Sequence, residues 1–87
     1  MHAVVVRVTL NDVEAAEREL RETVVPRVSQ APGFVSGCWT RKDNAGLSMI
    51  LFDSADAATR ASEMIPTTVP EHVTLEGVEV REVVAQA

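Results

Sequence analysis

The sequence has few of the residues that build disulfides, metal centres and aromatic binding surfaces. Among its 87 residues there is one cysteine, Cys38, there is no tyrosine, and one tryptophan and two phenylalanines are the only aromatic side chains. A single cysteine excludes an intrachain disulfide and a metal site built on paired cysteines, and it is typical of a reduced compartment such as the cytoplasm. His2 and His72 lack the spacing of zinc ligands, so we expect no metal site.

Positive charge and long apolar runs are also scarce. Eight lysines and arginines stand against 13 aspartates and glutamates, which gives a net charge of −5 and a pI near 4.9. Phosphate backbones and anionic lipid surfaces bind clustered cations, so we expect neither a nucleic acid nor a membrane partner. No stretch approaches the ~20 apolar residues of a membrane span. We therefore expect one soluble, cytoplasmic domain over residues 1–87.

Valine is abundant, and the first expected strand is apolar on both sides. Because side chains alternate along a strand, residues 2–10 form two faces, which carry Val4, Val6, Val8 and Leu10 on one side and Ala3, Val5, Arg7 and Thr9 on the other. The remaining chain supplies helices enough to cover one face only. We therefore expect a homodimer in which the sheets of two protomers pack against each other.

Two helices are expected between the strands. Asn11 has the position of a helix cap before the first helix, and Pro26 predicts a kink or restart near Val25 because proline lacks the N–H that helices require. Asp53 or Ser54 has the cap position of the second helix.

The other strands follow from β-branched residues and turn signals. Pro32-Gly33 predicts a type II turn, and residues 42–46 predict a hairpin loop. The expected strands after residues 2–10 are 34–41, 47–52 and 73–84, the last interrupted at Gly77. This order predicts an α+β protein of the ferredoxin-like βαββαβ class, with a four-stranded antiparallel sheet and two helices on one face.

Two short segments resemble a known family. Ala31-Pro32-Gly33-Phe34 and Leu51-Phe52-Asp53-Ser54 are similar to segments of the antibiotic biosynthesis monooxygenase group, which belongs to the dimeric α+β barrel proteins. The resemblance implies a dimeric barrel with one cavity per protomer. Active members commonly carry an asparagine and a tryptophan where Arg7 and Phe52 stand here. Haem-degrading members use a histidine on the second helix, which this chain lacks, so we expect no haem and no other cofactor.

The position of the site follows if Arg7 and Phe52 share the cavity face. Alternation then predicts a largely apolar ligand site formed by Arg7, Thr9, Trp39, Ser48, Ile50 and Phe52. Arg7 and Trp39 are weak catalytic candidates, Arg7 as an anchor for an oxyanion and Trp39 as a flat wall with one donor. The alternatives are an ion pair of Arg7 with Glu79, Glu82 or the partner subunit, and a place for Trp39 in the dimer interface. Cys38 has the opposite parity to Trp39 and is expected to face the helices.

Two functions are compatible with these residues. The first is a cofactor-independent, monooxygenase-like enzyme that acts on a small aromatic or polyketide-like substrate. The alternative is a module without catalytic activity that binds a small apolar or aromatic ligand or mediates dimerisation. The sequence contains no tyrosine and no histidine near the expected site, which weakens the first hypothesis.

Overall fold

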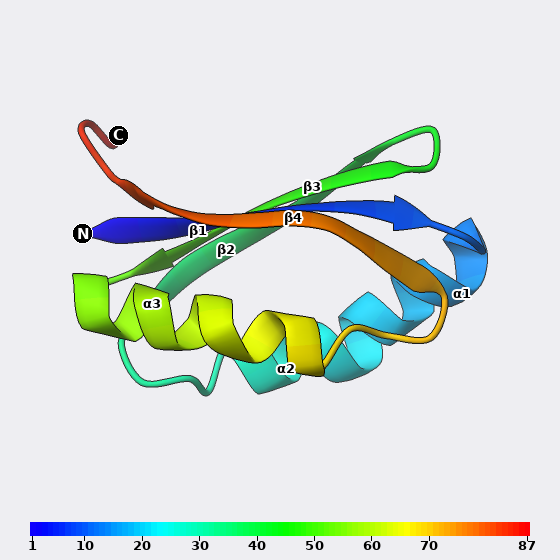
Figure 1. Ribbon diagram of the computed structural model, residues 1–87, viewed down its shortest axis with the longest axis horizontal. Helices are drawn as coiled ribbons and strands as arrows, with labels where there is room; N and C mark the ends of the chain where they lie inside the picture. Colours follow the sequence, from blue (N-terminus) through cyan, green and yellow to red (C-terminus); the bar gives the residue numbers. More distant parts are fainter.

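The computed structural model describes all 87 residues, and its centre is one antiparallel sheet (Figure 1). The four strands are β1 (His2–Leu10), β2 (Phe34–Lys42), β3 (Ala45–Phe52) and β4 (Val73–Glu82), in the order β2-β3-β1-β4. The predicted α+β class and the βαββαβ order are confirmed, and the arrangement is compatible with a ferredoxin-like fold.

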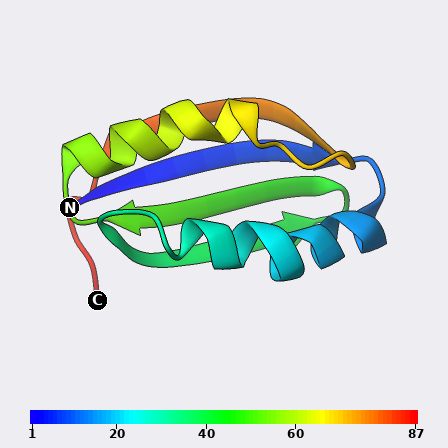
Figure 2. The ribbon, with the colours of Figure 1, turned by 90° about the horizontal axis from the view of Figure 1, so that it is seen from below.

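Two helical segments lie on the same face of this sheet (Figures 1 and 2). The first consists of α1 (Val13–Glu19), the π-helical turn η1 (Leu20–Val24) and α2 (Val25–Val28); the second consists of α3 (Ala55–Met64) and the 3-10 turn η2 (Ile65–Thr67). No helix has the length and apolar character that crossing a membrane requires. The other face of the sheet, which we call the open face, carries no helix.

The core lies between α3 and the two central strands. Val4 and Phe52 are fully buried there together with Ala58 of α3, whose small side chain lets the helix approach the sheet closely. Phe34 packs edge-on against Phe52 with ring centroids 6.3 Å apart, a favourable geometry for two aromatic rings. Alternation in β1 therefore assigns its even-numbered residues to the helix-covered face and its odd-numbered residues to the open face.

Side chains fix both helix starts. Asp12, not the predicted Asn11, caps α1: its carboxylate accepts a hydrogen bond of 3.1 Å from the Ala15 N–H. Asn11 instead donates to the Thr74 hydroxyl at 2.9 Å and ties the end of β1 to β4. Ser54, one of the two predicted caps, accepts from the N–H of Ala57 at 3.2 Å.

The predicted interruption near Val25 is confirmed. The N–H of Val25 donates to the carbonyl of Leu20, five residues back, so the helix takes one wide π turn immediately before Pro26. A proline in an ordinary α turn would leave the carbonyl four residues before it without a donor and would clash with it. After the wide turn the helical segment continues beyond Pro26 as α2.

Turns and bulges explain the strand boundaries. The N–H of Phe34 donates to the Ala31 carbonyl at 3.1 Å, and Gly33 has a φ of 82°, which confirms the type II turn. The β2–β3 hairpin is tighter than predicted, since only Asp43 and Asn44 separate the strands. The interruption at Gly77 is confirmed as a register shift of β4 against β1.

Candidate functional site

The two helical segments approach the sheet to different extents, and this difference leaves a cavity. α3 packs closely through alanines, whereas Leu20, Val24 and Val28 of the first segment point toward the sheet and remain only half-buried. The space between them has a volume of about 440 Å³. Cavities of roughly 300–1,000 Å³ accommodate small organic ligands.

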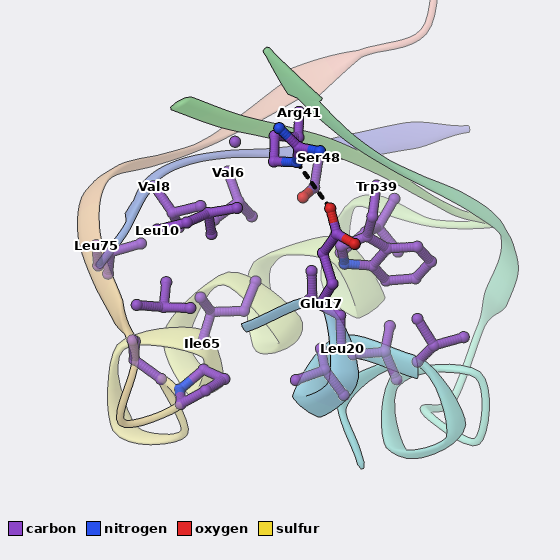
Figure 3. A pocket seen from close by; sticks show the side chains of 18 of the residues that line it. Val6, Val8, Leu10, Glu17, Leu20, Trp39, Arg41, Ser48, Ile65 and Leu75 are labelled. Atoms are coloured by element: carbon purple, nitrogen blue, oxygen red, sulfur yellow. Dashed lines mark hydrogen bonds and ion pairs between the residues drawn. The ribbon is translucent and has the colours of Figure 1, made fainter. Parts of the chain in front are cut away.

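The walls of the cavity are mainly aliphatic (Figure 3). All four strands contribute to one wall, the first helical segment supplies a second, and the connection from η2 to β4 closes a third. The apolar wall residues labelled in Figure 3 are Val6, Val8, Leu10, Leu20, Ile65 and Leu75. Such walls bind the apolar part of a ligand favourably, because each Å² of apolar surface removed from water contributes about 25 cal/mol of free energy.

Two polar groups face this cavity without a partner. Trp39 of β2 and Ser48 of β3 are directly opposite each other in the sheet, and such pairs have Cβ atoms about 5 Å apart. Ser48 is only 7% exposed, and neither its hydroxyl nor the indole N–H of Trp39 has a hydrogen-bond partner within the chain. The indole lies over Gly37, where a Cβ atom would come within 2.7 Å of the ring. Glycine at this position therefore makes room for the ring.

An ion cluster lies at the edge of the cavity. Glu17 reaches from α1 to Arg41 on β2, whose Nε donates to Oε1 at 2.7 Å, as Figure 3 shows. Arg41 Nη1 also donates to the carbonyl of Asp43 at 2.9 Å, and Arg21 Nη2 lies 3.4 Å from Glu17 Oε2. The cluster holds the first helical segment to the edge strand. Glu17 is the only carboxylate on the cavity wall.

The structure brings together only some of the predicted site residues. Trp39, Ser48 and Ile50 line the cavity. Phe52 lies on the same face of the sheet, fully buried in the core and outside this cavity.

The expectation that Arg7 and Thr9 share a face with Phe52 is wrong. In the β1–β3 register Val6 is opposite Ser48 and Arg7 is opposite Leu47, so Arg7 lies on the open face. Thr9 shares that face, where its hydroxyl donates to Glu76 at 2.8 Å.

Arg7 also lacks the ion pair within the chain that was one of the alternatives expected for it. It is exposed, its guanidinium lies across Gly77, and it has no acidic partner within the chain. The alternative pairs with Glu79 and Glu82 are not formed: Glu79 pairs with Arg81 at 2.8 Å, and Glu82 lies opposite His2, on the other face of the sheet from Arg7. Cys38 was expected against the helices, but it is exposed on the open face, opposite Met49.

The contribution of the first helix was missed at the level of sequence. No site role was expected for Glu17, yet it contacts Arg21 at 3.4 Å and Arg41 at the shorter distance of 2.7 Å. The available signal was its position next to Ala16, at the border of the apolar stripe. No group of three or more His, Cys, Asp or Glu side chains is positioned to hold a metal ion.

No protein-family model matches this chain, and no curated protein matches its sequence. The class of protein therefore rests on the fold and the site. The chain is a small α+β protein with one antiparallel sheet, a helix-covered face that encloses an apolar cavity, and an open second face.

Proposed function

We propose that this protein binds a small, mostly apolar molecule in the cavity between its helices and its sheet. The observation that carries the proposal is the pair formed by Ser48 and Trp39, two unpartnered hydrogen-bonding groups on a mainly aliphatic wall. Both groups can donate to one acceptor oxygen of a ligand, either a carbonyl or a phenolate. An apolar ligand that displaces water from these two groups would leave them without partners, at a cost of about 1–3 kcal/mol each. A ligand oxygen at this position avoids that cost because it accepts from both groups.

We further propose that the protein is a homodimer formed through the open face. Leu47 and Met49 are 50% and 48% exposed at the centre of this face, beside Leu51 and the buried Val5. Adjacent exposed apolar side chains on a sheet mark an interface. We choose a second copy of the chain as the partner because a two-fold axis places the apolar centre of one protomer against the same apolar centre of the other. The unpaired Arg7, which lies opposite Leu47 in the sheet, then gains access to acidic groups of the partner.

A cofactor-independent, monooxygenase-like activity on a small aromatic or polyketide-like substrate is the second proposal. It is favoured by the position of Glu17, a carboxylate on the wall that also presents the Ser48 and Trp39 donors. Glu17 would accept a phenolic proton, and the two donors would stabilise the resulting oxyanion. We prefer the binding function because Glu17 Oε1 already accepts a hydrogen bond of 2.7 Å from Arg41 Nε, so this oxygen is engaged in holding the first helical segment to β2.

A matched pair of ligands tests the binding proposal. 2-Acetylnaphthalene and 2-ethylnaphthalene have nearly the same shape, but only the first has an acceptor oxygen. Both are used to displace the neutral fluorophore 1-aminoanthracene. We expect the ketone to compete about tenfold better with the unmodified protein, and Ser48→Ala and Trp39→Phe each to reduce that preference.

Thr59→Ala is the control, because Thr59 is exposed on α3 and lines no cavity described above. Equal competition by both compounds would contradict the role of the polar pair, and a failure of 1-aminoanthracene to bind would contradict the ligand cavity. Oxygen consumption with 1-naphthol, compared between the unmodified protein and Glu17→Gln, separates catalysis from binding alone.

A further inference from the structure

A second hollow continues the cavity between the two helical segments. It has a volume of about 550 Å³ and is lined by α2, α3 and the turn before β2. Ile50 of the sheet forms a floor that both spaces share, and Val28, Ile65 and Thr68 on the helical side also line both. We call the two together the groove. Figure 2 shows the two helical segments side by side in front of the sheet. The groove therefore suits a ligand longer than the first cavity alone would hold.

The second hollow differs from the first because its arginines have no ion pair within the chain. Arg27 of α2 and Arg60 of α3 both line it, and neither has a carboxylate oxygen within 4.0 Å. At the other end of the groove Arg21 and Arg41 both contact Glu17. Arginines without a carboxylate partner are thus found at one end of the groove only.

Two acidic residues near these arginines limit what can bind there. Asp53 and Asp56 also line the second hollow, so its formal charge is zero. Long-range attraction of anions is therefore weak, and recognition depends on direct hydrogen bonds from the guanidinium groups. A group with two negative charges would be repelled by both aspartates. A single carboxylate matches the planar fork of arginine and carries one charge.

We propose that the groove binds an amphiphilic monocarboxylate, with its apolar body over Ile50 and Ile65 and its carboxylate between Arg27 and Arg60. This inference rests on the proposed ligand-binding function and adds the chemical class of the ligand. The body lies on the shared apolar floor, and the far end reaches the Ser48 and Trp39 pair when the ligand carries a second oxygen. The floor excludes water from the body, and the arginines hold the charged end near solvent, so desolvation of the carboxylate remains incomplete.

Decanoate and 1-decanol test this assignment, because they share one chain and differ in the charge of the head group. We expect decanoate to displace 1-aminoanthracene about tenfold better than decanol does from the unmodified protein, as charge-assisted hydrogen bonds predict. In the double variant Arg27→Gln with Arg60→Gln, decanoate should fall to the level of decanol, while decanol itself is unchanged. Arg18→Gln is the matched control, since Arg18 is exposed, has no ion pair and lines neither hollow.

The outcomes separate this inference from the proposed function. Equal competition by decanoate and decanol, with 1-aminoanthracene still bound, overturns the carboxylate site and leaves the ligand cavity in place. A preference for decanoate that persists in the double variant also overturns it. If 1-aminoanthracene does not bind, the proposed function fails, and calorimetric titration with decanoate then decides the present inference: absence of heat refutes it.

Discussion

Charging the open face should separate the proposed dimer without unfolding the protomer. The variant carries Leu47→Lys and Met49→Lys, at positions that are 50% and 48% exposed within one chain. Full burial of such a side chain contributes about 1.5–3 kcal/mol, so burying the exposed half contributes about 1 kcal/mol each. Two side chains on each of two protomers give about 4 kcal/mol, which corresponds to a dissociation constant weakened by roughly a thousandfold. Desolvation of the new lysines makes this a lower bound.

Sedimentation velocity over micromolar concentrations measures this effect directly. We expect the unmodified chain to sediment at twice its mass of 9.4 kDa and the double variant to sediment as a monomer with an unchanged circular dichroism spectrum. Met64→Lys is the matched control, because Met64 is 60% exposed but lies on α3, on the opposite side of the sheet. A monomeric unmodified protein, or a double variant that remains dimeric, would refute the assignment of this face.

Two further predictions concern the stability of the protomer. Phe52→Ala removes the largest fully buried side chain and should lower the free energy of unfolding by about 3–5 kcal/mol in urea titrations, while Phe52→Leu costs much less; a loss below 1 kcal/mol for Phe52→Ala would contradict the core assignment. Gly33→Ala places a Cβ 2.6 Å from Asp53 Oδ1 at a φ of 82°, and it should cost about 1–2 kcal/mol. An unchanged melting temperature in Gly33→Ala would show that the turn is not the one described.

The features that could be predicted from the sequence depend on a few neighbouring residues. Pro32-Gly33 specifies its turn through the fixed φ of proline and the positive φ that glycine tolerates. Pro26 specifies an interruption because its missing N–H affects one carbonyl of the same helix. The predicted cap of α1 was one residue too early. Asn11 and Asp12 are both suitable cap residues, but Asn11 donates to Thr74 instead and Asp12 caps the helix.

The site could be predicted only in part, because it depends on the register between distant strands. Assigning Arg7 and Phe52 to one face implied a β1–β3 register that differs from the observed one by one residue. A register shift of one residue moves every side chain of a strand to the opposite face of the sheet. The two-residue hairpin at Asp43 and Asn44 sets the observed pairing of β2 with β3, which places Trp39 beside Ser48. The loop expected over residues 42–46 was too long to define that pairing.

The contact of Glu17 with Arg41 shows a second limit of sequence reasoning. These residues are 24 positions apart, and each is surrounded by other charged residues with which it could pair. Their meeting depends on how far the first helical segment stands from the sheet. That distance follows from packing of the whole protomer, which no local pattern encodes.

The unequal packing of the two helical segments is the physical origin of the site. Ala58 lets α3 settle on the central strands and form the core, so stability does not require the first segment to pack equally closely. The first segment instead carries the π turn, whose half-buried Leu20 and Val24 face the cavity. Local π turns of this kind are frequent at functional sites because they displace a helix from regular packing. An apolar ligand would supply the contacts that these two side chains lack, so ligand binding should stabilise this segment more than α3. Hydrogen exchange measured with and without bound 1-aminoanthracene tests this consequence, and equal protection of both segments would contradict it.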